Sequence, residues 1–404
     1  MKTIALAFRY LWSRPLAAGL NLLLLSLGLA SITMVLLVRE QIDHAFERDL
    51  AGIDLVVGAK GSPMQLILAG VFQIDVPTGN IALSEVRELE KNPQVAQLIP
   101  LSMGDSGRGF RIVGTTVDYI SHYEATLAVG ELWSQPMQVV LGSQVAQATG
   151  LQLGQRFVGS HGLGSGGHVH GDNPYRVRGV LNPCGCVLDR LALTATESVW
   201  QVHDKSYEGD TPLDAEDKAA IAADREITEA LIRYKSPLAA VTFPRYVNSS
   251  TNMQAAAPAV EITRLLHMVG VGTDVLRGFG VVLLLTAGLS VFIALWNAVR
   301  ERQADLAMLR MLGAPPTRVA ALVLSEALWL ALLASLVGLV GGHLLSGLIG
   351  AMLEGQQSLS VSGWIWVDAE WAVPALAVGV AVLAAMLPTW AAYRLDVFSL
   401  LNER

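Results

Sequence analysis

Charged side chains are scarce in this chain of 404 residues. Only 16% of them are charged, whereas 52% are hydrophobic and the mean hydropathy is positive. A composition this poor in charge places the chain among membrane proteins. Nearly all of the formal net charge of -7 comes from residues 203–229, which hold nine acidic and three basic side chains. The acidic balance is therefore local. It identifies no substrate, and we expect no nucleic-acid partner.

Four segments are almost free of charge: residues 16–38, 278–299, 319–352 and 371–393. Each is long enough to cross a bilayer, which takes about 20 residues of helix. The first is far longer than the apolar core of a secretory signal, and residues 31–38 lack a small-residue cleavage pattern. We interpret it as a retained membrane anchor.

Lys and Arg near the ends of these segments predict the orientation of the chain, because such residues gather on the cytoplasmic side. They occur in residues 1–15, 300–318 and 394–404, and are missing from residues 353–370. We therefore expect a cytoplasmic interfacial helix at 1–15, a cytoplasmic helix at 300–318 and a cytoplasmic tail at 394–404. Residues 39–277 and the short loop 353–370 should be exported.

The exported region is long enough to fold, and its pattern is mixed. Short apolar runs at residues 53–57, 110–113, 138–141 and 175–180 predict strands. Residues 84–91 predict a helix with Ser84 as its N-cap, and a second helix is predicted from Thr211 to about Tyr234. The predicted fold class is a polytopic α-helical membrane protein with four transmembrane helices and a large exported mixed α/β domain with a stalk.

Residues 300–314, RERQADLAMLRMLGA, interrupt the apolar runs with a short charged segment. Leu306, Leu309 and Leu312 recur every three residues, Arg302 and Asp305 are spaced to pair, and Gly313 ends the helix. Such a helix suits docking onto a soluble partner that moves the flanking spans. The alternative is an amphipathic interfacial loop.

In this arrangement the chain resembles permease subunits of the MacB/FtsX/LolE superfamily of ABC transporters. The resemblance covers nearly the whole length: one span, a large exported domain, then three spans. Residues 300–314 resemble the family's coupling helix, continued by SEAL at 325–328. In the exported domain VLGSQVA at 140–146 and GLQLG at 150–154 resemble a family signature, and YRLDVFSLL at 393–401 resembles its tail.

The resemblance implies a homodimer in a bacterial inner membrane, joined to two copies of a separate ATPase subunit. The chain has no G-x-x-x-x-G-K-[ST] phosphate loop, so we expect no enzymatic activity of its own. Family members work by mechanotransmission, and this chain would extract or export a hydrophobic, lipid-linked or metal-associated substrate. The alternative is a non-transporting, metal-responsive regulator of an envelope hydrolase or sensor. Other expected partners are membrane lipid and a periplasmic protein or lipoprotein. The implied ATPase-coupling residues are Arg300, Glu301, Arg302, Asp305, Leu306, Leu309 and Arg310.

Histidine is concentrated in one exported loop. His161, His168 and His170 fall within ten residues, and the only cysteines, Cys184 and Cys186, follow at chelating spacing. Imidazoles and thiolates are good ligands for zinc and other transition metals. The sequence leaves two fates open for the cysteines, a bound metal or a local disulfide, and a mobile loop without a metal role is the plainer interpretation of the histidines.

Two ionisable residues lie inside the third predicted span, Glu326 and His343. Such groups in a membrane segment are functional candidates, and we favour packing or coupling over a proton relay. The same segment is rich in glycine, which favours close helix packing. We expect these glycines to line a dimer seam: Gly338, Gly341, Gly342, Gly347 and Gly350.

Overall fold

The computed structural model describes residues 2–162, 173–203, 224–354 and 361–394. It divides into two compact units. We call Met1–Asp43 with Met268–Arg404 the helical unit, and His44–His267 the sheet domain. The predicted tail at 394–404 lies outside the described residues after Arg394.

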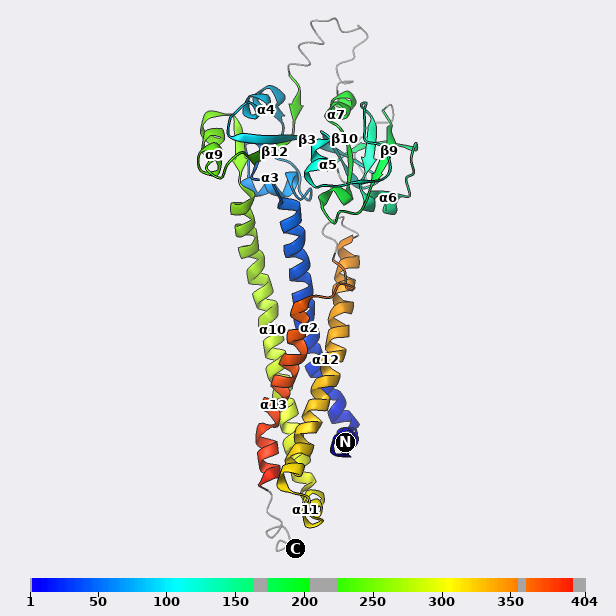
Figure 1. The fold of residues 1–404 in the computed structure, drawn as a ribbon, viewed down its shortest axis with the longest axis vertical. Coiled ribbons are helices and arrows are strands. Elements are labelled where there is room, and N and C mark those ends of the chain that lie inside the picture. Colours follow the sequence, from blue (N-terminus) through cyan, green and yellow to red (C-terminus); the bar gives the residue numbers. More distant parts are fainter. Residues whose placement is uncertain (1, 163–172, 204–223, 355–360, 395–404) are drawn as a thin grey trace, which may run out of the picture. The chain divides into compact units, whose positions relative to one another are not determined.

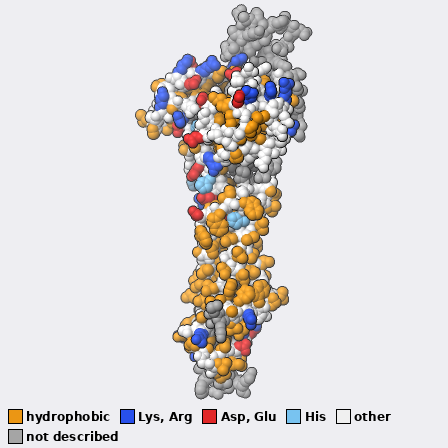
Figure 2. All heavy atoms as spheres, turned by 45° about the vertical axis from the view of Figure 1, so that its right-hand side comes forward, with side chains coloured by type: hydrophobic (Ala, Val, Ile, Leu, Met, Phe, Trp, Pro, Cys, Tyr) orange, Lys and Arg blue, Asp and Glu red, His pale blue; other side chains and the backbone are white. Residues whose placement is uncertain are grey.

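The helical unit is built from long apolar helices (Figure 1). Four segments are long and apolar enough to cross a membrane: Pro15–Leu50, Asp274–Glu301, Pro316–Met352 and Asp368–Tyr393. Hydrophobic side chains cover most of its visible surface in Figure 2, as expected where lipid is the solvent. The prediction of four transmembrane helices is confirmed. The helices are α1 (Lys2–Leu11), α2 (Pro15–Leu50), α10 (Pro258–Glu301), α11 (Gln303–Met311), α12 (Pro316–Glu354) and α13 (Ala372–Tyr393), with the short η3 (Asp368–Trp371) before α13.

Glycines on α12 let α2 approach closely. A Cβ at Gly338 would lie 2.6 Å from the Cβ of Leu29, and one at Gly342 would lie 2.4 Å from the Cβ of Thr33. These positions are filled by the chain's own α2, so the hypothesis that they line a dimer seam is wrong for Gly338 and Gly342. Small residues allow α2 and α12 to approach closely, and this matters because van der Waals packing drives helix association in lipid.

The sheet domain contains an 11-stranded mixed sheet, with nine strands in the order β13-β1-β12-β3-β4-β10-β6-β9-β5; β7 pairs with β9 and β8 with β3. β3 is its longest strand and pairs with β12, β4 and β8. A second, two-stranded sheet joins β11 and β2. The strands are β1 (Leu55–Ala59), β2 (Ile81–Ala82), β3 (Val95–Gly107), β4 (Phe110–Thr115), β5 (Leu127–Gly130), β6 (Gln138–Leu141), β7 (Arg156–Phe157), β8 (Ser160–His161), β9 (Tyr175–Leu181), β10 (Leu191–Ala195), β11 (Glu226–Ile227), β12 (Glu229–Tyr234) and β13 (Met253–Ala256).

Two apolar clusters form the cores of this domain. One contains Leu55, Ile232 and Phe243, and the other contains Val139 and Tyr175, all fully or nearly fully buried. Short helices cover the sheet (Figure 1). They are α3 (Pro63–Gly70), α4 (Leu83–Glu90), α5 (Asp118–His122), α6 (Ser143–Thr149), α7 (Thr196–His203), α9 (Ala239–Ser250) and the 3-10 turn η1 (Val187–Arg190).

All four strands expected from short apolar runs are confirmed, as β1, β4, β6 and β9. Ser84 is not the N-cap of α4, because the helix already begins at Leu83 after Ala82. The helix predicted from Thr211 to about Tyr234 is wrong at its C-terminal end, where β11 and β12 lie within residues 226–234. Ala230, Leu231 and Ile232 are consecutive and all buried, which a central strand permits and a surface helix does not. Residues 204–223 lie outside the described part.

Candidate functional site

The charged segment between the second and third spans folds as a short helix with defined ends. α10 ends at Glu301, Arg302 has a non-helical backbone, and α11 follows at once. At the other end, Gly313 has a φ of +92°. Its N–H donates to the carbonyl of Arg310, and the N–H of Ala314 donates to that of Leu309, both at 3.0 Å. This is a Schellman stop, which glycine permits because it has no Cβ.

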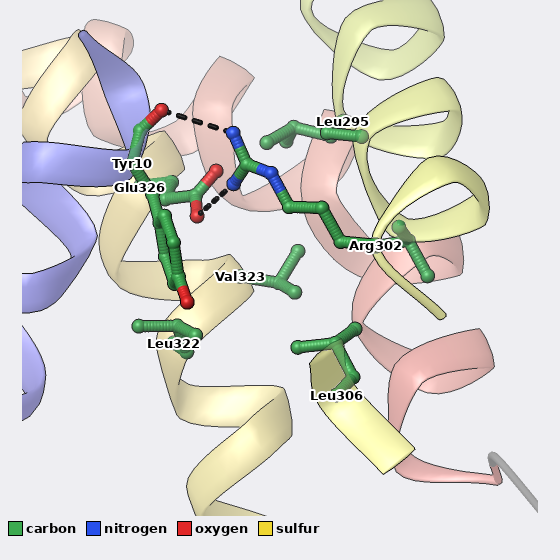
Figure 3. Close-up of a pocket in the computed structure, with 9 residues that line it drawn as sticks. Tyr10, Leu295, Arg302, Leu306, Leu322, Val323 and Glu326 are labelled. Carbon is green, nitrogen blue, oxygen red and sulfur yellow. Dashed lines mark hydrogen bonds and ion pairs between the residues drawn. The ribbon is translucent and has the colours of Figure 1, made fainter. Parts of the chain in front are cut away.

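Arg302 is the central residue of this junction (Figure 3). Its Nη1 lies 3.1 Å from Oε1 of Glu326 on α12, and its Nη2 donates to the carbonyl of Tyr10 at 3.0 Å and to Oγ of Ser13 at 2.6 Å. The guanidinium also lies over the Tyr10 ring, 4.6 Å from its centroid. The expected pair with Asp305 is thus replaced by contacts that join three segments of the chain, because the break in the helix turns Arg302 away from α11.

The surroundings of this pair are largely apolar. Glu326 is only 6% exposed, and Leu295, Leu306 and Val323 line the pocket around it (Figure 3). A neighbouring cavity of about 160 Å³ is lined by residues of α1, α2, α10 and α12, Glu326 among them. A charged pair in such surroundings is strongly coupled, because little water screens it. Glu326 and Arg302 therefore hold each other in place.

Three further contacts join α1, α2 and the turn between them to the helices around the same junction. The indole Nε1 of Trp329 on α12 donates to the carbonyl of Ile4 at 3.1 Å. Arg14 forms an ion pair with Glu301, and the hydroxyl of Ser290 donates to Asn21 at 2.6 Å. The N-terminal helix is therefore attached to the helices that flank α11.

The two faces of α11 differ. Leu306 and Ala307 are buried in the helical unit, and Leu309 is half-buried against the same core. The opposite face exposes Met308, Met311 and Leu312, with 56%, 56% and 80% of their surface accessible. Asp305 is exposed as well, and Arg300 lies over the ring of Trp296 at 5.6 Å. The surface that α11 offers to a partner is therefore made by methionines and Leu312, with Leu306 stabilising the helix from behind.

His343 lies at the other end of α12. Its Nε2 is 2.8 Å from Oε2 of Glu370, and its Nδ1 is 2.8 Å from the carbonyl oxygen of Gly363. Glu370 is fully buried. Both ring nitrogens are thus engaged in holding the segment before α13, which supports the packing role favoured for this residue.

The proposed metal ligands are only partly within the described chain. Cys184 and Cys186 form a disulfide with their Cα atoms 5.2 Å apart, so their sulfurs are not thiolates in this structure. His161 Nδ1 lies 3.1 Å from Oδ1 of Asp105. His168 and His170 lie outside the described residues. Within the described ranges, no three His, Cys, Asp or Glu side chains are grouped as a metal site.

The disulfide turn is held mainly by carboxylates. Asp189 accepts from the backbone N–H of Gly185 at 2.7 Å, and Asp49, at the end of α2, accepts from that of Val187 at 2.7 Å. Arg48 donates to the carbonyl of Gly185 at 2.7 Å. The sequence drew attention to the cysteines but gave no signal for these acids. Asp49 is far from Val187 in the chain, and Asp189 binds a backbone N–H, a group that almost every residue has.

Two family models match the chain. The MacB-like periplasmic core domain matches residues 18–230, and the FtsX-like permease C-terminal domain matches residues 277–397. Among solved structures, the periplasmic region of MacB from Actinobacillus actinomycetemcomitans is 13% identical, with a TM-score of 0.34 over 54% of this chain and 95% of that one. The extracellular domain of the transporter YknZ from Gram-positive bacteria is 12% identical, with a TM-score of 0.30 over 50% and 98% of the two chains.

Two curated relatives are named pyoverdine export ATP-binding/permease protein PvdT. The protein of Pseudomonas syringae pv. tomato is 24% identical over 84% of this chain and 51% of its own length. That of Pseudomonas savastanoi pv. phaseolicola is 23% identical over 100% and 60%. The chain thus spans a little over half the length of these relatives. With one family model covering more than half of its residues and a second covering three of its four spans, the chain belongs to the MacB/FtsX-type family of ABC transporter permeases.

Proposed function

We propose that this permease works by mechanotransmission as a homodimer in a bacterial inner membrane, with ATP hydrolysis supplied by a separate ATPase subunit. The observation that carries the proposal is the set of contacts made by Arg302. One guanidinium joins the α10–α11 break to Glu326 on α12 and to Tyr10 and Ser13 at the N-terminus. A displacement of α11 is therefore passed to three helices at once.

The outward face of α11 suits a docking groove. Met308, Met311 and Leu312 present flexible apolar side chains, and methionine adapts well to a partner's surface. Amphipathic helices that enter apolar grooves use anchors at such three- and four-residue spacings. We propose that the ATPase contacts this face, while Leu306 and the Arg302 junction keep the helix rigid behind it.

α10 provides the route for the movement. It is one helix from Pro258 to Glu301, 44 residues or about 66 Å at 1.5 Å per residue. Its last residue adjoins Arg302, and its first residues belong to the sheet domain. A push on α11 is thus applied to a continuous helix that begins in the exported domain.

The docking face is tested with Met308→Asp and Met311→Asp, which place charge on the apolar surface of α11. We expect the ATPase subunit to be lost on co-purification and ATP hydrolysis to become uncoupled, with the melting temperature of the permease unchanged. Thr317→Asp, at an exposed site at the start of α12, is the matched control. Normal association of the ATPase subunit with the methionine variants would show that this face of α11 is not the docking surface.

The substrate is proposed as hydrophobic, lipid-linked or metal-associated. Export of pyoverdine, named for the two relatives, supports outward transport by a protein of this kind. Reconstituted dimers with the ATPase should release such a substrate in an ATP-dependent manner. ATP-gated binding of an envelope hydrolase or another periplasmic or lipoprotein partner, without release of any substrate, would favour the regulatory alternative.

Metal binding by the histidine loop is a further proposal, supported by the clustering of His161, His168 and His170 in the sequence. The test is a zinc titration of the purified chain, compared with a variant in which all three are alanine. Tight binding that disappears in the variant supports the proposal. Equal binding by both proteins excludes these ligands.

A further inference from the structure

Three tryptophans with exposed rings precede α13. Trp364, Trp366 and Trp371 are 95%, 52% and 68% exposed, and Ile365 beside them is 46% exposed. Indole rings are large, apolar and equipped with one N–H donor. They are therefore poorly suited to bulk water, and they collect at the headgroup level of membranes.

The segment that carries them, residues 361–371, folds back along α12. A Cβ at Gly350 would lie 1.8 Å from the carbonyl oxygen of Val361, and one at Gly347 would lie 3.7 Å from the Cα of Gly363. The segment thus passes Gly350 first and Gly347 next, and His343 then closes it through Gly363 and Glu370. Two hydrogen bonds between Gln41 on α2 and the backbone of Ser362, at 2.7 and 2.9 Å, fix its other side.

This path defines a depth in the membrane. His343 lies eleven residues before Glu354, the end of α12, which is about 16 Å of helix. α13 starts at Ala372, two residues after the Glu370 that His343 binds. Its 22 residues measure about 33 Å, close to the ~30 Å thickness of the hydrocarbon layer. The bilayer surface therefore meets this helix near its first residue, where Trp371 is exposed.

The rings of Trp366 and Trp371 are close to that level, and Trp364 follows Gly363, whose carbonyl oxygen contacts His343. Trp366 and Trp371 lie 5.8 Å apart between ring centroids, and Trp366 stacks on His343 at 6.1 Å. With four spans and the MacB-like domain between the first two, this segment is on the exported side of the membrane. The segment has no Lys or Arg, so charge attraction to anionic lipid contributes nothing here.

We propose that residues 361–371 form an anchor in the headgroup layer of the exported leaflet, with Trp364, Trp366 and Trp371 in contact with phospholipid. Zwitterionic phospholipid suffices as the ligand. The segment then fixes the height of α12 and α13 in the bilayer.

The test uses the full chain in nanodiscs of zwitterionic phospholipid, with bromine placed either high or deep on the acyl chains as a quencher. Because the chain has nine tryptophans, the signal of one is obtained by subtracting the spectrum of Trp364→Phe from that of the unaltered protein. We expect this difference spectrum to be blue-shifted from that of indole in water, quenched most by shallow bromine and unaffected by anionic lipid. Trp200→Phe, in the sheet domain, is the matched control and should show no lipid quenching.

A nitroxide at Ile365→Cys provides a second measurement that keeps all three tryptophans. Its depth should fall between those of labels at Leu383→Cys on α13 and Leu238→Cys in the sheet domain, both highly exposed. Quenching of Trp364 by aqueous acrylamide alone would overturn the proposal, since the ring would then face water. Quenching by neither reagent would also overturn it, since protein would then cover the ring.

Discussion

Carboxyl groups are buried in both units, but one in the sheet domain, Glu229, differs in its surroundings from those of the helical unit. In the helical unit, Glu326 pairs with Arg302 at 3.1 Å and Glu370 with His343 at 2.8 Å. In the sheet domain, Glu229 is fully buried on β12, and among the described residues neither of its carboxyl oxygens has a hydrogen-bond partner. The nearby Arg111 instead donates to the carbonyl of Asp75 at 2.5 Å.

The difference follows from the surroundings. Among membrane helices, an ionised group is stabilised by a partner from another segment of the chain, because the lipid around the helices offers it no hydrogen bond. In the sheet domain, burial raises the pKa of Glu229 well above its ordinary value, although the charge of Arg111 opposes this. A protonated carboxyl is neutral and can remain buried. The helical unit thus uses its acids to join helices, whereas burial in the sheet domain favours the protonated, neutral form of Glu229.

The largest effect is expected from Glu326→Ala, which tests the role of paired acids in the helical unit. It leaves the largely buried Arg302 without its counter-charge. Removing one partner of a buried pair costs about 3–5 kcal/mol. We expect a large drop in melting temperature in detergent and loss of ATPase coupling. Asp274→Ala on α10 is the control, since its pair with Arg277 is exposed and contributes less than about 1 kcal/mol. If Arg302→Ala/Glu326→Ala is no more stable than Glu326→Ala, the unpaired charge is not the cause.

Gly342→Ala separates packing from charge in the helical unit. The added methyl would lie 2.4 Å from the Cβ of Thr33, so α2 must move away, at a cost of about 1–3 kcal/mol. Gly379→Ala on α13 meets nothing within 4 Å and should be neutral or stabilising, because alanine favours helix. Thermal unfolding in one detergent compares them. Equal melting temperatures would show that α2 and α12 are not closely packed.

Glu229→Gln tests whether the buried carboxyl of the sheet domain makes the stability of the protein depend on pH. Because the folded-state pKa of Glu229 lies above the unfolded value near 4.5, the folded state holds the proton more tightly. The stabilisation is therefore complete below about pH 4.5 and is lost as the pH rises toward the folded pKa, with a slope of at most about 1.4 kcal/mol per pH unit. The glutamine variant should lack this slope in melting curves recorded across pH. Glu90→Gln, at an exposed site, should retain it.

The smallest effect is expected from replacing both Cys184 and Cys186 with serine. Their disulfide closes a very short loop, which contributes only about 1.6 kcal/mol by chain entropy. Asp189 and Asp49 continue to hold the turn, so the sheet domain should stay folded in melting curves with and without reductant. Asp189→Asn should destabilise it more. The opposite order would mean that the disulfide, and not the carboxylates, maintains the turn.

Local patterns were sufficient for much of this fold. Apolar length predicted the four spans, and short apolar runs predicted β1, β4, β6 and β9. The acidic composition after Thr211 led to a helix prediction that ran too far toward the C-terminus. It covered Ala230–Ile232, which form a strand because they are buried between neighbouring strands. For the site, the sequence placed Arg302 and Glu326 among the candidates but could not pair them. Their contact spans 24 residues, whereas spacing reveals only partners within one or two turns.

The same limit applies to the faces of α11. Apolar residues occupy both sides of this helix, so spacing alone could not tell that Leu306 faces inward and Met308 outward. Tyr10 and Ser13 were missed as site residues because a backbone carbonyl and a lone serine hydroxyl form no recognisable motif. Only the tertiary fold brings the N-terminal helix to this junction.

Strand β3 bears on how the exported domain folds. Its first half, Val95–Leu101, pairs with β12, and its second half, from Ser102, pairs with β4. The two apolar clusters on either side of it therefore share one backbone ladder. Neither half of the sheet can lose its hydrogen bonds without exposing an edge of the other. The domain should consequently unfold as one cooperative unit, with amide protons in both halves exchanging at the same global rate.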